Sequence, residues 1–204
     1  MSYENSIAFL GPAGTYCNEA ALRFAARLGI DDPDLVECAS FDEVFDCVDD
    51  GTVRFGVVGK DTIMENGSHF FEILDLGFGR CRFALACKKG VDFFSGYRAK
   101  TVATKYPNIA RQFFESRAMD VRIIKIEGSV ELAPLLGLAD GIVDIVETGA
   151  TLRENGLEVV ETITQISARL IANTASLKLR KAEIESLAAR LERSIAESRG
   201  EKTV

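Results

Sequence analysis

The chain has 204 residues, of which 47% are hydrophobic and 27% charged, and its formal net charge is −7. This composition is typical of a globular protein with one large or two small α/β lobes. The negative charge argues against binding to nucleic acid, which needs a basic face, but helix ends and a few cations can still bind a phosphate. No apolar run reaches membrane-spanning length, and the first residues do not resemble a signal peptide, so we expect no membrane association.

The cysteines are five in number and have no CxxC spacing. Most of them lie in apolar surroundings, where a cysteine usually serves as a small core residue. We therefore expect reduced thiols and a cytoplasmic location. The residues concerned are Cys17, Cys38, Cys47, Cys81 and Cys87.

The first predicted unit is a strand, a loop and a helix. Residues 6–10 form a short apolar run, the loop GPAGT follows, and residues 18–28 carry apolar side chains at helical spacing. A loop between a strand and a helix N-terminus can hold an anion or a carboxylate, so Gly11, Gly14 and Thr15 are candidates to line a ligand cleft. Gly-Pro and Gly are also ordinary loop residues, so the loop alone does not decide between the two interpretations.

Residues 55–58 predict a further strand, and Lys60 and Asp61 follow it. Open α/β sheets bind ligands at the carboxyl ends of their strands, which makes Lys60 a candidate for binding phosphate or pyrophosphate and Asp61 a candidate to line the cleft. A solvated lysine is the alternative. His69 is the single histidine, and no acid is placed by spacing to form a triad with it. Residues 70–76 predict a short amphipathic helix that closes the first lobe.

The middle of the chain alternates strands and helices. Residues 81–87 predict a strand, and the chain is expected to cross into a second lobe directly after it. Strands are predicted at 101–104 and 121–126, with a helix at 109–117 between them. This βαβ series predicts a parallel sheet.

Three polar residues follow strands of this predicted sheet. Thr104 and Lys105 come at the end of one strand, and Ser129 lies in the loop after the next. Because the carboxyl ends of parallel strands share one edge, these residues are candidates to line the same cleft. Ser129 is equally well explained as the cap of the following helix.

Residues 138–157, LADGIVDIVETGATLRENGL, contain the arrangement most specific for a ligand. A β-branched run predicts a core strand at 141–146, a small-residue loop covers 147–151, and a short helix ends at Gly156. The amides of Thr148, Gly149, Ala150 and Thr151, with the two threonine hydroxyls, form a cradle for one phosphate. The same residues also suit an ordinary turn and helix cap, so both interpretations are open.

Two acidic residues flank this loop. Asp144 and Glu147 would repel a phosphate, but they suit ribose hydroxyls or a magnesium ion carried by a polyphosphate. Beyond the loop, residues 157–163 and 166–172 predict two strands that return to the first lobe. Residues 175–199 predict an amphipathic helix that faces the core or a partner.

Long stretches of the sequence resemble two enzyme families. DLGFGRCRFALA (75–86), VATKYPN (102–108), residues 123–157 and ISARLIANTASLK (166–178) resemble the catalytic subunit of ATP phosphoribosyltransferase in its short form, over about residues 56–199. IAFLGPAGTYCNEAALRFA and CASFDEVFDCVDDGTVRFGVV instead resemble the start of prephenate dehydratase, over about residues 6–58. The sequence therefore reads as a mosaic joined near residues 55–59.

Both families share an architecture, which the resemblance extends to this chain. It implies an α/β protein of two lobes with mostly parallel sheets and a cleft between them, like the type II periplasmic binding proteins. We expect residues 1–88 and 165–204 to form the first lobe and residues 89–164 the second.

The first resemblance also implies an activity. N1 of ATP would attack C1′ of phosphoribosyl pyrophosphate (PRPP), with Mg²⁺ carried by PRPP, in the first step of histidine biosynthesis. Asp144 and Glu147 would be the catalytic residues, while Thr148 to Thr151 and Lys60 would bind PRPP. The short form of this family implies a homo-oligomer and a regulatory subunit that resembles a synthetase.

One departure from the family concerns the first loop. The family has a Pro-Lys-Gly-Arg-type loop whose cations contact ATP, whereas GPAGT contains no cation, and no Lys or Arg lies between Arg27 and Arg54. We therefore expect the PRPP site to be retained and ATP binding to be weak or altered. A non-catalytic two-lobed binding or regulatory subunit is the alternative. A dehydratase is a third hypothesis, although the later Thr-Arg-Phe motif of that family is absent.

Overall fold

The computed structural model describes residues 5–53, 55–67, 71–77 and 79–172, together with residues 189 and 193. The chain folds as two compact units. The first runs over residues 1–63, 67–79 and 167–204, and the second over residues 64–66 and 80–166.

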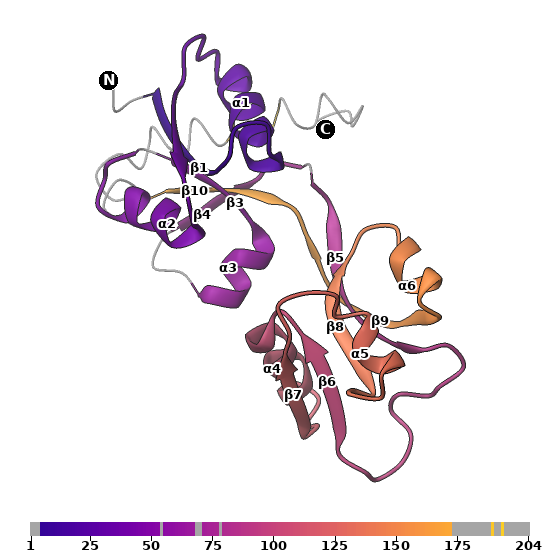
Figure 1. The fold of residues 1–204 in the computed structure, drawn as a ribbon. Helices are drawn as coiled ribbons and strands as arrows, with labels where there is room; N and C mark the ends of the chain where they lie inside the picture. Colours follow the sequence, from indigo (N-terminus) through magenta and orange to yellow (C-terminus); the bar gives the residue numbers. More distant parts are fainter. Residues whose placement is uncertain are drawn as a thin grey trace. The chain divides into compact units, whose positions relative to one another are not determined.

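The first unit is built on a five-stranded sheet in the order β2-β1-β3-β10-β4 (Figure 1). The strands are β1 (Ser6–Leu10), β2 (Asp34–Cys38), β3 (Phe55–Gly59), β4 (Phe71–Asp75) and β10 (Ala168–Ala172). β1 pairs in parallel with β2 and β3, whereas β10 pairs antiparallel with β3 and β4. The carboxyl ends of β2, β1 and β3 therefore meet at one edge of this sheet.

The helices of the first unit are α1 (Tyr16–Leu28), α2 (Phe41–Asp49) and the start of α3 (Lys60–Asn66), whose last three residues belong to the second unit. α2 begins with a reciprocal cap, because the Ser40 hydroxyl accepts from the Glu43 amide at 3.1 Å while the Glu43 carboxylate accepts from the Ala39 amide at 2.7 Å.

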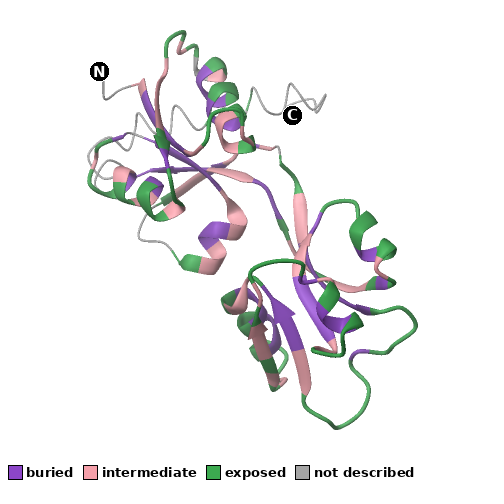
Figure 2. Cartoon of the chain, in the orientation of Figure 1, coloured by how far each residue is buried: buried purple, intermediate pink, exposed green. Residues whose placement is uncertain are grey.

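The core of the first unit lies on both faces of its sheet. Ile7 and Phe9 belong to one buried cluster with Phe24 of α1, and Ala8, between them, belongs to a second cluster with Val44 of α2. This alternation follows from the two-residue period of a strand. A strand covered on both faces must be apolar throughout, which explains the buried run of β1 (Figure 2).

The second unit has a five-stranded sheet in the order β7-β6-β8-β5-β9. Its strands are β5 (Cys81–Lys88), β6 (Lys100–Thr104), β7 (Val121–Lys125), β8 (Gly141–Val146) and β9 (Leu157–Ile166). β6 is parallel to β7 and β8, and β5 is antiparallel to β8 and β9. In each sheet, therefore, the fourth strand alone runs against the other four, which agrees with the predicted mostly parallel α/β fold.

The helices of the second unit are α4 (Pro107–Glu115), α5 (Leu132–Leu135) and α6 (Ala150–Glu154). α4 packs its aromatic residues Phe113 and Phe114 into one buried cluster of the sheet. α5 and α6 contribute to the other cluster.

An acidic side chain caps α4. The Glu65 carboxylate accepts from the backbone amides of Asn108 and Ile109 at 3.1 Å, and the Asn108 side chain donates to the Glu65 carbonyl oxygen at 2.9 Å. A carboxylate at this position pairs free amides and interacts favourably with the helix dipole.

Two predictions about this arrangement were wrong. Residues 70–76 were expected to be helical, but Phe71–Asp75 is strand β4, because it pairs with β10 almost a hundred residues later in the chain. β5 was expected in the first lobe, but it belongs to the second unit, since its hydrogen-bonding partners are β8 and β9. The chain accordingly leaves the first unit after Gly79 rather than after Lys88.

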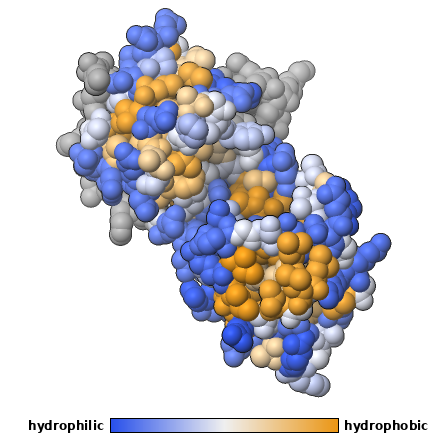
Figure 3. All heavy atoms as spheres, viewed as in Figure 1, coloured by the Kyte–Doolittle hydropathy of each residue, from blue (hydrophilic) through white to orange (hydrophobic). Residues whose placement is uncertain are grey.

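Apolar side chains gather on the surface of the second unit around α5 (Figure 3). They include Leu132, Leu135, Leu136 and Leu138, and Leu136 is 70% exposed. None of the helices in the described residues has both the length and the apolar character needed to cross a membrane. His69 and the predicted helix at 175–199 lie outside the described residues, apart from residues 189 and 193.

Candidate functional site

The carboxyl edge of the second sheet brings the predicted loops together. β7, β6 and β8 are neighbours and run parallel, with Thr104 opposite Lys125 on one side and Val143 on the other. The segments that follow these strands therefore emerge at the same edge (Figure 1). Lys105 and the loops at 126–129 and 147–151 lie there, as the sequence predicted.

The conformation of the loop at 147–151 is set by contacts within the loop and with α6. Gly149 has φ +72°, a left-handed conformation that favours glycine. The Ala150 amide donates to Thr148 Oγ1 at 3.3 Å, and the Arg153 Nη1 donates to the Thr148 carbonyl oxygen at 3.0 Å. These contacts set the turn between β8 and α6.

The side chains of this loop are available to a ligand. Glu147, Thr148, Ala150 and Thr151 are exposed. The cap residue Gly149 makes no side-chain hydrogen bond to α6, and the Ala150 amide has only the long contact with Thr148 Oγ1. Exposed hydroxyls beside such amides suit an anion with hydrogen-bond acceptors, such as a phosphate.

Asp144 lies on β8 shortly before this loop and is half-buried. Burial raises the pKa of its carboxyl group, and the hydrogen bond from the Ile145 amide, 2.8 Å from Oδ1, opposes that rise. Glu131 raises the same pKa further and Lys105 lowers it, so these side chains act on Asp144 from neighbouring segments. Asp144 therefore lies within electrostatic range of the segments that carry Glu131 and Lys105.

Thr104 and Lys105 have different roles at this edge. Thr104 is fully buried, and its Oγ1 accepts from the Tyr106 amide at 2.8 Å, which stabilises the turn into α4. Lys105 is exposed and helps to lower the pKa of Glu127, whose main partner is Lys125 at 2.7 Å. Lys105 is therefore a cation near two acidic groups of the site.

Ser129 is not a helix cap. It has φ +30°, and its carbonyl oxygen accepts from the Leu132 amide at 3.1 Å, while α5 begins at Leu132 with Glu131 in the cap position. A tight turn over Ser129 to Leu132 therefore precedes α5, in place of a cap at Ser129. Ser129 is exposed in this turn.

The polar groups of the GPAGT loop form hydrogen bonds with neighbouring residues of the first unit. The Ala13 amide donates to Glu37 Oε2 at 3.1 Å, and the Gly14 amide donates to Asn18 Oδ1 at 3.0 Å. Thr15 caps α1, accepting from the Asn18 amide and donating to the Leu10 carbonyl oxygen. Two of the loop amides that an anion would use are therefore already paired.

Glu37 also explains the glycine that opens this loop. A Cβ on Gly11 would clash with the Glu37 side chain, so glycine lets this carboxylate reach the loop. A carboxylate at this place repels a phosphate.

Lys60 and Asp61 follow β3, next to the GPAGT loop at the carboxyl edge of the first sheet. Lys60 is the first residue of α3, and its ammonium group pairs with Glu72 of β4. Asp61 lies against Gly59, where a Cβ would clash with its carboxylate, and it contributes after burial to the raised pKa of Cys17. The predicted phosphate-binding lysine therefore has an internal partner.

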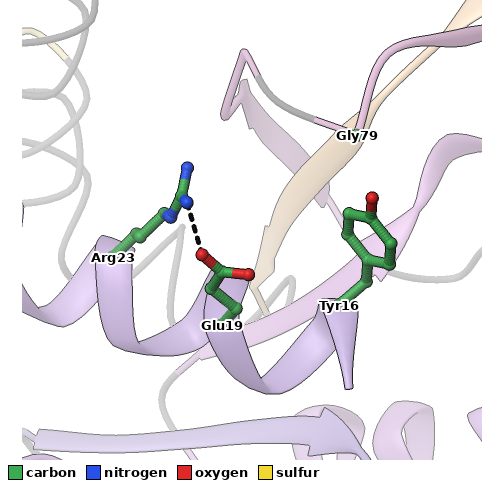
Figure 4. Close-up of a pocket in the computed structure, with 4 residues that line it drawn as sticks. All are labelled: Tyr16, Glu19, Arg23 and Gly79. Atoms are coloured by element: carbon green, nitrogen blue, oxygen red, sulfur yellow. Dashed lines mark hydrogen bonds and ion pairs between the residues drawn. The ribbon is translucent and has the colours of Figure 1, made fainter. Parts of the chain in front are cut away.

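A small recess of about 120 Å³ lies beside α1. Tyr16, Glu19 and Arg23 line it from one side of the helix, and Gly79 lies on the facing segment (Figure 4). Glu19 and Arg23 form an ion pair there. The recess is smaller than the roughly 300 Å³ that small-molecule sites usually occupy.

The sequence interpretation missed several polar residues. Arg153 follows the loop by one helical turn, Glu131 and Glu37 reach their sites from other loops and strands, and Glu72 lies in a segment that was expected to be helical. Only Arg153 had a local signal, because it lies four residues, one helical turn, after Gly149 of the loop. The described residues contain no group of three or more His, Cys, Asp and Glu side chains that could hold a metal ion.

Comparison with known proteins decides the family. The family model of ATP phosphoribosyltransferase (HisG) matches residues 41–193, three quarters of the chain. The chain belongs to the ATP phosphoribosyltransferase family. The family model of prephenate dehydratase matches residues 7–66, so both predicted resemblances are confirmed.

Relatives within the ATP phosphoribosyltransferase family are similar over the same part of the chain. The enzymes of Clostridium kluyveri and Clostridium botulinum are 58% and 60% identical over 145 and 137 residues, which are 71% and 67% of this chain. The chain spans 66% and 65% of the length of these relatives, just under two thirds.

Solved structures confirm the fold class. A chain of the ATP phosphoribosyl transferase (HisG:HisZ) complex from Thermotoga maritima is 29% identical, with a TM-score of 0.74, over 94% of this chain and 98% of that chain. The periplasmic aliphatic sulphonate binding protein SsuA from Escherichia coli has a TM-score of 0.63 at 12% identity, over 96% of this chain and 73% of that chain. The latter likeness shows the fold alone.

Proposed function

We propose that this protein is an ATP phosphoribosyltransferase that joins N1 of ATP to C1′ of PRPP and releases pyrophosphate, the first step of histidine biosynthesis. The observation that supports this most is the loop at 147–151, which lies at the carboxyl edge of β8 within the region matched by the family. Its exposed hydroxyls and first helix amides suit the 5′-phosphate of PRPP. Thr148, Gly149, Ala150 and Thr151 would hold that phosphate.

The reaction needs positioning more than a nucleophilic side chain. Charge develops on the ribose carbon as pyrophosphate leaves, and a nearby carboxylate stabilises positive charge. Asp144, before the loop, and Glu147, its first residue, would serve the ribose side. Magnesium would arrive with PRPP and neutralise the pyrophosphate group, as this ion commonly binds through substrate phosphates.

ATP binding is expected to be weaker than in a typical member of the family. The GPAGT loop has no cation, its amides at Ala13 and Gly14 are paired, and Glu37 adds a negative charge. Separate calorimetric titrations with PRPP and with ATP test this asymmetry. Tight ATP binding without any PRPP signal would contradict it.

The activity is tested with ATP, PRPP and magnesium by following the absorbance of the adduct. The assay is run with and without a regulatory subunit that resembles a synthetase, and the Asp144→Asn variant is the control for the site. Adduct formation that depends on both substrates supports the proposal. Phenylpyruvate formed from prephenate would favour the dehydratase hypothesis instead.

A non-catalytic binding subunit is the second candidate. The paired amides and the missing cations of the GPAGT loop favour it. They would weaken the binding of ATP and leave the binding of PRPP intact. PRPP binding without turnover, even with the regulatory subunit, would support this role.

We further propose that the protein is cytoplasmic and self-associates. The cysteines form no disulfide within the described residues, which fits a reducing compartment. The exposed leucines around α5 form an apolar surface of the kind that proteins use for association. Light scattering of the wild type and of Leu136→Asp checks the oligomer, which the substitution should weaken.

A further inference from the structure

Four charged side chains of the first unit form one network. Glu72 of β4 accepts from two cations, since Lys60 Nζ pairs with its Oε2 and Arg169 Nη1 lies 3.0 Å from its Oε1. Arg169 Nη2 also lies 3.5 Å from Asp75 Oδ2. The side chains of Lys60, Glu72 and Arg169 are 28%, 26% and 18% exposed, so the network is mostly shielded but still open to solutes.

The two halves of this network differ in how firmly they are held. Asp75 Oδ1 accepts from the Ser167 hydroxyl at 2.7 Å and from the Gly77 amide at 2.8 Å, so the Asp75–Arg169 side is tied to the backbone. Lys60 has a flexible side chain and starts a helix at the carboxyl end of β3. When Lys60 turns away, Glu72 therefore keeps a cationic partner in Arg169.

We propose that Glu72 competes with the ligand for Lys60 and so makes this position selective for polyanions. A pyrophosphate group offers several charged oxygens and displaces Glu72 from the lysine, whereas a single carboxylate gains nothing from the exchange. Arg169 keeps the released Glu72 in place. The proposal rests on the proposed function, because a pyrophosphate group is what the substrate PRPP carries.

Substitutions of Glu72 and of Lys60 should change the affinity for pyrophosphate in opposite directions, which tests this competition. Binding of inorganic pyrophosphate is measured by calorimetry for the wild type and for Glu72→Gln, Glu72→Asp and Lys60→Gln. Removing or shortening the competitor should tighten binding about two- to fivefold, the range for a partly exposed ion pair. Removing Lys60 should weaken it.

Glu72→Asp separates the loss of the contact with Lys60 from a change in the charge of the protein. It leaves the net charge unchanged, while its shorter side chain draws the carboxylate back from Lys60. Glu161→Gln is the matched control, because Glu161 pairs with Arg117 of the second unit at a similar exposure. This control should leave pyrophosphate binding unchanged.

Weaker or unchanged binding in both Glu72 variants would overturn the competition, as would the absence of pyrophosphate binding in all the proteins. The measurement contains no ATP and requires no turnover. Loss of transferase activity together with the expected binding pattern would therefore contradict the proposed function and leave this inference standing.

Discussion

Arg153 reaches back over the turn before its own helix, and its Nη1 donates to the carbonyl oxygen of Thr148 at 3.0 Å. The same guanidinium lies 3.3 Å from the position that a Cβ on Gly149 would take. Arg153 therefore stabilises the turn of the loop, and it places a positive charge beside Thr148 and Gly149.

Replacing Arg153 should loosen the loop. We expect Arg153→Gln to raise the KM for PRPP about three- to tenfold, because one hydrogen bond from a charged group is lost, with a smaller effect on kcat. Steady-state kinetics with varied PRPP provide the measurement. Arg153→Lys should recover part of the loss, and Arg122→Gln, at an exposed position on β7, should have no effect.

Alanine at Gly149 should impair both stability and binding. The left-handed conformation costs about 1–2 kcal/mol for a residue with a Cβ, and the methyl group would press against Arg153. Gly156, with φ +63° and open space around it, is the matched control. Urea unfolding should show a loss of stability in both variants, whereas only Gly149→Ala should lower kcat/KM for PRPP. Equal effects of the Gly149 and Gly156 substitutions on kcat/KM would contradict a role of the loop in binding PRPP.

The Asp144 carboxyl group should make stability depend on pH. Its pKa in the folded protein is raised above the ordinary value of 3.8, mainly by burial, so the folded chain holds this proton more firmly than the unfolded chain. The resulting stabilisation is present below pH 3.8 and is lost as pH rises through the folded pKa. Asp144→Asn should thus be more stable than the wild type at neutral pH but less active.

Urea unfolding at a series of pH values measures the difference between Asp144→Asn and the wild type. This difference in the free energy of unfolding should shrink as the pH falls toward 3.8. Asp120→Asn, at an exposed position before β7, serves as the control. A constant difference across the series would mean that Asp144 does not titrate in this window.

The cap of α4 should contribute to the stability of the second unit. Glu65→Ala leaves the Asn108 and Ile109 amides without their acceptor and should cost about 1 kcal/mol. Glu115, at the other end of α4, is the contrasting control, because an acid at a helix C-terminus is unfavourable. Hydrogen exchange of the α4 amides should speed up in Glu65→Ala and not in Glu115→Ala.

Local patterns predicted most of the fold. The β-branched run at 141–146 became β8, and the small-residue loop after it took the expected turn with Gly149 in a left-handed conformation. Alternation of strands and helices predicted parallel neighbours, which β6, β7 and β8 are. These features depend on residues close in sequence, so the sequence alone contains them.

Contacts between distant segments could not be predicted in this way. Phe71–Asp75 is a strand only because β10 pairs with it, and Lys60 is paired because Glu72 lies on that strand. The Ala13 amide of the GPAGT loop donates to Glu37, a side chain more than twenty residues away. No spacing rule connects such residues, so the pairing of these candidate binding groups emerges only in the folded chain.

The ladder between β3 and β10 has a consequence for how such a chimaeric sequence can fold. In the part of the first sheet that the structure describes, β3 joins β1 and β2 to β10 and β4 by pairing Gly56 to Gly59 with Ala168 to Ile171. At Gly56 a Cβ would lie 2.9 Å from side-chain atoms of both Ile171 and Val48. An opening segment that comes from another enzyme therefore has to match β10 along one short ladder. At Gly56 this match requires a residue without a Cβ.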